Sequence, residues 1–204
     1  MGLILNRRRE MGGELLPYDA QIQYLQSNGS QWIDTGVKFK GSSKIEISFM
    51  GLAQNNLAVF GADNGSAWNT GEIALFWNGS VFEPVIPTSN SASIVPVRPT
   101  YATNTLYNVS LDKSSIVFNG TSYSISMYAS YVCSRNLFLL ATNRGSAIVP
   151  SSCKLFYTKI YDNGVLIRDL IPVRVGTAGY LYDKVSKTFF GNSGSGSFTL
   201  GPDV

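Results

Sequence analysis

The sequence predicts an all-β fold in which many short strands form either a sandwich or a barrel. Apolar residues alternate with polar ones in several segments, as at Ile45, Ile47 and Phe49, and this period of two is typical of half-buried strands. Asn-Gly dipeptides, which favour tight hairpin turns, recur along the chain. No segment shows the 3.6-residue period of an amphipathic helix. Short strands separated by regular turns are typical of sandwiches and barrels.

The length of 204 residues suits one large β domain, and a hydrophobic content of 44% can supply its core. Charged residues make up 14% of the chain, well below the ~25% of typical domains. The surface is therefore rich in hydroxyl, amide and glycine groups. Such a surface suits extracellular or virion exposure, or hydrogen bonding to sugars, but from composition alone an ordinary β-sandwich is the preferred interpretation. The net charge of +3 includes no basic stripe, so no nucleic-acid partner is expected.

Residues 1–20 differ from the rest of the chain and are expected to form an N-terminal arm or anchor. This segment carries Arg7, Arg8 and Arg9 and shows no alternation. The three arginines could contact an acidic partner, although a solvated arm is the ordinary interpretation. A single domain is expected over residues 21–204.

Neither export nor membrane insertion is expected from the sequence. The apolar opening Met1–Asn6 is too short for a signal core, and the arginines follow it rather than precede it. No stretch approaches 18 uninterrupted apolar residues. We therefore expect a protein that does not leave the cell by the standard secretory route.

Four further segments complete the expected order of elements. Residues 107–111 alternate like residues 45–49. Residues 84–104 contain four prolines, which predicts a long surface loop with one short strand near 93–97. The continuous apolar run at residues 136–141 predicts a central strand covered on both faces. Residues 153–171 predict a hairpin around Asn163-Gly164.

Two segments carry a resemblance to a known family. They are QYLQSNGSQWIDTG at residues 23–36 and KIYDNGVLIRDLIPVRVGTAGYLYDKVSKTFFGNSGSGSFTLGPDV at residues 159–204. The chain resembles the concanavalin A-like, laminin-G-like jelly-roll domains of phage and prophage proteins from gut bacteria. The resemblance implies a two-sheet antiparallel jelly-roll sandwich in which the two ends of the chain meet in one sheet. It also implies that Ile33 points inward and that Asp34 hydrogen-bonds the following turn.

The residue content argues against catalysis. The chain has no histidine, which removes Ser-His-Asp and Cys-His nucleophile systems and histidine metal sites. Glycoside hydrolysis needs two carboxyl groups ~5–10 Å apart. The domain contains Glu46, Glu72 and Glu83, and none of them has another carboxylate within five residues. No enzyme activity and no cofactor are expected.

Two aspartates and two cysteines are the candidates for metal binding and for a disulfide bond. Asp63 and Asp162, each followed by asparagine, could contribute oxygen ligands to calcium. The preferred interpretation of both aspartates is that they belong to turns, and no metal site is expected. Cys133 and Cys153 are interpreted as free, partly buried thiols, with a bond between neighbouring strands as the alternative.

A sugar site would need an aromatic platform beside amide and charged groups. The candidates are Trp68 with Asn69, Trp77 with Asn78, and Asn143 with Arg144. They would form a glycan-binding rim if their loops were neighbours at one end of the sandwich. The alternative interpretation makes the two tryptophans core or rim-packing residues.

Two functions follow as hypotheses. The first is a non-catalytic virion structural protein, such as a capsid decoration, auxiliary or head-fibre protein. It would be located in the virion, with the major capsid protein, other virion proteins or copies of itself as partners. The second is a carbohydrate-binding adhesion module for host-surface or mucus glycans. Gut phages are implied by the family resemblance and not by composition.

Overall fold

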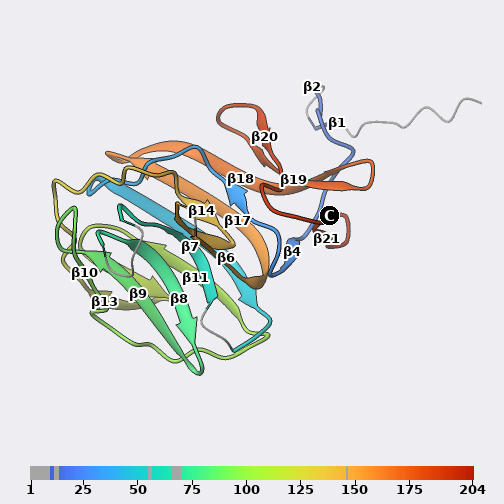
Figure 1. The fold of residues 1–204 in the computed structure, drawn as a ribbon. Helices are drawn as coiled ribbons and strands as arrows, with labels where there is room; N and C mark the ends of the chain where they lie inside the picture. Colours follow the sequence, from blue (N-terminus) through green and yellow to red (C-terminus); the bar gives the residue numbers. More distant parts are fainter. Residues whose placement is uncertain (1–9, 12–13, 55–56, 66–69, 146) are drawn as a thin grey trace, which may run out of the picture.

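The computed structural model describes residues 10–11, 14–54, 57–65, 70–145 and 147–204. Two antiparallel sheets pack face to face around one core, and the prediction of an all-β sandwich is confirmed (Figure 1). The jelly-roll expectation agrees with this arrangement. No helix among the described residues is long and apolar enough to cross a membrane.

The larger sheet contains the strands from both ends of the chain. Its main path runs through β13 (Thr121–Ser124), β12 (Ser115–Phe118), β11 (Leu106–Leu111), β6 (Ser43–Gly51), β17 (Ser152–Asp162), β18 (Val165–Val175), β19 (Ala178–Asp183) and β20 (Thr188–Phe190). β3 (Ala20–Gln21) pairs with β18, while β4 (Leu25–Asn28) pairs with both β17 and β21 (Thr199–Leu200). The two chain ends therefore meet in one sheet, as the resemblance implied.

The smaller sheet covers the other side of the core. Its path runs through β10 (Ser93–Ile94), β9 (Val81–Pro87), β8 (Ile73–Asn78), β7 (Leu57–Ala62), β14 (Phe138–Leu139) and β5 (Ile33–Asp34), with β15 (Ala141–Arg144) and β16 (Ala147–Pro150) attached to β7. The contact between β7 and β15 is parallel, although the other pairings described in this sheet are antiparallel.

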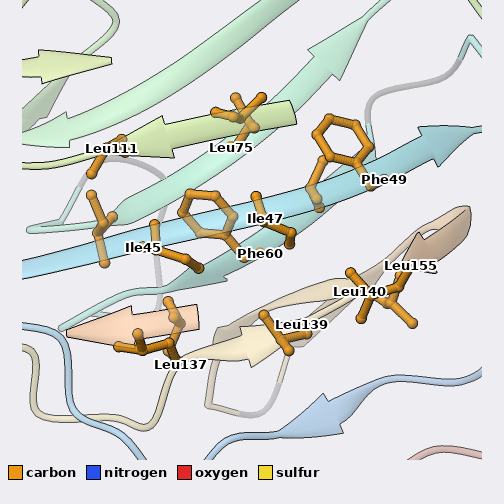
Figure 2. Packing of buried hydrophobic residues seen from close by; sticks show 14 of the residues in the cluster. Ile45, Ile47, Phe49, Phe60, Leu75, Leu111, Leu137, Leu139, Leu140 and Leu155 are labelled. Carbon is orange, nitrogen blue, oxygen red and sulfur yellow. The ribbon is translucent and has the colours of Figure 1, made fainter. Parts of the chain in front are cut away.

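Alternating strands supply the core, because every second side chain of a strand faces the same side of its sheet. Ile45, Ile47 and Phe49 of β6 are fully buried, and Tyr107, Val109 and Leu111 of β11 are at most 8% exposed. Figure 2 shows the side chains of β6 packing against Phe60 and Leu75 of the opposite sheet. The predicted strands at residues 45–49 and 107–111 are confirmed.

Asn-Gly pairs form two of the expected hairpin turns. At Asn163-Gly164, between β17 and β18, both residues have positive φ (50° and 79°), as a type I′ turn requires. Asn119-Gly120 does the same between β12 and β13. In each case asparagine and glycine tolerate the left-handed region that other residues avoid.

The apolar run at residues 136–141 is buried as predicted, but it is not one strand. β14 contains only Phe138–Leu139, and β15 begins at Ala141. Leu140 lies between them with a φ of 64°, because the chain turns there from antiparallel to parallel contact with β7. A hydrogen bond from the Leu140 N–H to the Val59 carbonyl (2.6 Å) and complete burial hold this leucine in place.

The predicted loop at residues 84–104 is wrong at its start. Pro84 lies inside β9 and Pro87 ends it, and β9 pairs with β8 over residues 81–85. On its other side β9 meets β10 only at Ile86 and Pro87. Pro84 therefore lies where one side of β9 has no partner strand, a position at which the missing N–H of proline is tolerated.

The N-terminal segment joins the sandwich ahead of Gln21. β1 (Glu10–Met11) and β2 (Glu14–Leu15) form a separate two-stranded sheet beside it (Figure 1). Tyr18 is then 5% exposed and packs on Tyr182, with ring centroids 5.2 Å apart. The packed body thus includes Tyr18, a few residues before the expected boundary.

Candidate functional site

The residues predicted to form a glycan-binding rim do not meet at one end of the sandwich. Trp77 and Asn78 end β8, beside Leu57, the first residue of β7. Asn143 pairs with Ala62 at the other end of β7, where β8 begins with Ile73. Four residues of strand, about 13 Å, separate the two groups along the sheet. Trp68 and Asn69 lie outside the described residues.

Trp77 is a core residue rather than a sugar platform. Its side chain is fully buried, and its indole N–H donates to the Ala53 carbonyl at 2.7 Å. The ring stacks on Tyr101, with centroids 5.1 Å apart, and on Phe49. A buried indole whose single donor is already used offers nothing to a ligand. The alternative interpretation of Trp77 as a core aromatic is therefore the correct one.

Arg144 is engaged in a buried ion pair with Glu72. Its Nε and Nη2 atoms lie 3.1 Å and 2.9 Å from Oε1 of Glu72, whose side chain is fully buried. The Thr142 hydroxyl donates to the same oxygen at 3.2 Å, and the guanidinium lies 5.4 Å from the centre of the Phe76 ring. Burial raises the pKa of Glu72, and Arg144 opposes this effect by favouring the ionised form.

Asn143 is also used within the fold. Its side-chain amide donates to the Asn136 carbonyl at 3.0 Å, and its amide oxygen accepts from the Gly145 N–H at 3.1 Å. The bond to Gly145 holds the start of the turn that follows β15. Asn143 and Arg144 therefore both make contacts within the fold.

Glu72 and Glu83 are each paired with an arginine. Phe76 lies opposite Glu83 across the β8–β9 ladder, and Glu72 precedes Phe76 by four residues. Their backbones are therefore separated by about 13 Å along the strand direction. Glu83 is moreover paired with Arg98.

The two aspartates considered for calcium serve turns and ion pairs. Asp63 accepts from the Gly65 N–H at 2.9 Å, while Asp162 accepts from Lys40 at 2.7 Å and from the Ser42 hydroxyl at 2.7 Å. In the described part of the chain, no group of three or more acidic or cysteine side chains is placed to hold a metal ion.

Both cysteines are buried and free. Burial raises the pKa of the Cys133 and Cys153 thiols, which keeps them protonated. Cys133 lies beyond β13 on the way to β14, whereas Cys153 lies in β17 of the larger sheet. They act as small core residues.

A polar and aromatic patch on the larger sheet was not predicted from the sequence. Tyr157, Glu46 and Asn108 line one pocket on the sheet face that points away from the core, which we call the outer face. The sequence did hold a signal for it. Phe156 and Tyr157 are adjacent aromatic residues, and the residues on either side of them, Leu155 and Thr158, are fully buried. Two adjacent aromatic residues interrupt the strict alternation of a strand.

Comparison with protein-family models and with curated proteins finds no match to this chain.

Proposed function

We propose that this chain is a non-catalytic structural protein of a bacteriophage virion, with a concanavalin A-like jelly roll that decorates the capsid or belongs to a head fibre. Its partners would be the major capsid protein, other virion proteins or further copies of itself. The family resemblance of residues 23–36 and 159–204 supports the phage assignment. The two-sheet sandwich is the fold that this resemblance implies.

The observation that carries the proposal is the position of the N-terminal segment. β1 and β2 form their own sheet, which within the described part of the chain shares no ladder with the sandwich. Leu16 and Tyr18 then attach the chain to Val173 and Tyr182 of the larger sheet. A segment that is anchored at its base and carries a small sheet beyond it suits attachment to another protein. Arg7–Arg9, the predicted anchoring residues, lie outside the described residues.

The use of charged groups inside the sandwich supports a structural role. Glu72 is neutralised by Arg144, and Glu83 by Arg98. Asp183, which is fully buried, accepts from the Ser186 hydroxyl at 2.6 Å and from the backbone N–H of Asp169 at 2.8 Å. These carboxylates hold turns and strands together, and such groups are not poised for proton transfer.

Mass spectrometry of purified virions from the phage or induced prophage that encodes the chain tests the proposal. We expect the chain in particles at a constant ratio to the major capsid protein. Finding it in the lysate and never in particles would refute the virion assignment.

A charge-reversal variant tests the anchoring role of the N-terminal segment. Replacing Arg7–Arg9 by glutamate should lower incorporation into particles, because the cluster would meet an acidic partner surface. The matched control reverses three exposed lysines on the sandwich, Lys38, Lys113 and Lys187. Equal incorporation of both variants would exclude the arginines as the anchor.

A further inference from the structure

Strand β13 lies at one edge of the larger sheet, at the end of its path away from β19 and β20 (Figure 1). Within the described part of the chain, β13 pairs with β12 on one side and with no strand on the other. An edge of this kind presents backbone N–H and C=O groups that can pair with another strand. Thr121, Ser122 and Ser124 are exposed, so solvent reaches this edge.

The register of the β12–β13 hairpin determines which residues face the open side of β13. The two-residue turn Asn119-Gly120 places Phe118 opposite Thr121 as a hydrogen-bonded pair. Hydrogen-bonded and non-hydrogen-bonded pairs alternate along an antiparallel ladder. The backbone groups of Ser122 and Ser124 therefore point away from β12, toward the open side.

The side chains of β13 divide between the two faces of the sheet. Tyr123 lies opposite Ile116 of β12, which is fully buried. Its ring packs edge-on against Phe118, with centroids 6.2 Å apart. Tyr123 is nevertheless only half-buried, because β13 has a neighbouring strand on one side alone. Ser122 and Ser124 project from the opposite, outer face.

The chain around this edge carries no charged side chain. Residues 114–134 include no lysine, arginine, aspartate or glutamate, and β13 contains neither proline nor a register shift. Charged residues, prolines and bulges are the usual features that keep sheet edges from pairing with other chains. The opposite edge of the same sheet differs, because Lys184 and Lys187 precede the three residues of β20. The open side of β13 is therefore the edge of this sheet that suits a partner strand.

We propose that β13 pairs with β13 of a second copy of this chain about a twofold axis, so that the two larger sheets continue as one antiparallel sheet. A twofold interface brings the same patch of both copies together, so the patch has to be self-complementary. An uncharged strand meets this condition, since like charges directly opposite each other would destabilise the pairing. The contact forms in solution and does not depend on the proposed place in a virion.

The backbone groups on the open side fix the register of this contact. Ser122 forms a hydrogen-bonded pair with Ser124 of the second copy, and Ser124 with Ser122 of the second copy. Tyr123 then lies opposite Tyr123 of the second copy in a non-hydrogen-bonded pair, in which the Cα atoms are about 4.5 Å apart. The two half-buried rings meet on the core side, where aromatic cross-strand pairs stabilise a sheet.

Cysteine cross-linking tests this register. A disulfide bond needs Cα atoms about 4.4–6.8 Å apart, which a non-hydrogen-bonded pair provides. Tyr123→Cys should therefore form a covalent dimer under mild oxidation, seen on a non-reducing gel, whereas the native Cys133 and Cys153 are buried. Thr188→Cys, at an exposed position of β20, is the matched control and should remain a single chain.

Charged variants test whether the uncharged edge permits the contact. Sedimentation equilibrium of the wild type should give a mass that rises with concentration toward twice that of one chain. The double variants Ser122→Lys/Ser124→Lys and Ser122→Glu/Ser124→Glu each place like charges opposite one another, so each should keep the single-chain mass. An equimolar mixture of the two variants should recover the dimer, because opposite charges then face each other.

Asn78→Lys/Ser80→Lys is the control for added charge. Both residues are exposed where β8 turns into β9 in the smaller sheet, so this variant should dimerise like the wild type. Thermal unfolding checks that every variant is folded. A single-chain mass for the wild type up to millimolar concentration, dimers that persist in both charged variants, or equal cross-linking of Tyr123→Cys and Thr188→Cys would each overturn the proposal.

Discussion

Replacing Arg144 by methionine should destabilise the protein strongly at neutral pH. The substitution removes three hydrogen bonds to Glu72, from Nε to Oε1 (3.1 Å) and from Nη2 to Oε1 (2.9 Å) and Oε2 (3.1 Å). The Glu72 side chain is fully buried. Removing one partner of a buried ion pair costs about 3–5 kcal/mol, since the remaining charge stays out of water. For a domain of this size, each kcal/mol lowers the melting temperature by about 2–4 °C. The expected loss is therefore roughly 6–20 °C.

The pH dependence separates this effect from a loss of packing. Burial raises the pKa of Glu72 above its ordinary value. Such a carboxyl group favours folding below its unfolded-state pKa of about 4.3, and this contribution is lost as the pH rises through the folded-state pKa. Without Arg144 the folded-state pKa rises further. The loss of stability in Arg144→Met should thus be largest at neutral pH. It should shrink as the pH falls toward the unfolded-state pKa of about 4.3.

Urea unfolding of the wild type, Arg144→Met, Glu72→Gln and the double variant measures the effect. The double variant should recover much of the lost stability, because no buried charge remains without a partner. Lys184→Met is the control: it removes a surface ion pair with Asp169 of 2.9 Å, in which the lysine is 49% exposed, and should cost at most about 1 kcal/mol. Additive single-variant losses, or a deficit that does not change with pH, would refute the reasoning.

Three further outcomes are expected from individual residues. Gly164→Ala should cost about 1–2 kcal/mol in urea unfolding, because φ is 79° there while the space around a new Cβ is open; an unchanged stability would contradict the type I′ turn. Cys133 and Cys153 should resist a thiol reagent in the folded protein and react fully in denaturant, since both are buried; fast reaction of the native protein would contradict this burial. Trp77→Ala should cost about 3–5 kcal/mol because the ring is fully buried, and a loss below about 1 kcal/mol would show that Trp77 is not a core residue.

The prediction of the fold succeeded where local sequence pattern determines local structure. Alternation at residues 45–49 sorted side chains into buried and exposed sets, because a strand permits only two side-chain directions. Asn163-Gly164 formed its hairpin because both residues accept positive φ. Asp34 accepts from the Gly36 N–H at 2.8 Å, as the resemblance implied. Each of these results depends on only a few consecutive residues.

The position of the candidate site was not predictable in the same way. Asn143 and Trp77 are separated because they lie beside opposite ends of β7, Asn143 beside Ala62 and Trp77 beside Leu57. Pairing order and register of this kind depend on contacts between distant segments, which no local pattern specifies. The same holds for Pro84, which lies in a strand because β10 leaves that part of β9 unpaired on one side.

The sequence by itself determined that this protein is all-β, free of histidine and turned by tight Asn-Gly hairpins, since period, composition and turn chemistry are local properties. The tertiary structure decided which polar groups are used and which remain accessible. It buried Glu72 against Arg144, and through the bulge at Phe156 it placed Tyr157 beside Glu46 and Asn108. The physical reason is that the packing of two sheets fixes which face of each strand is removed from water.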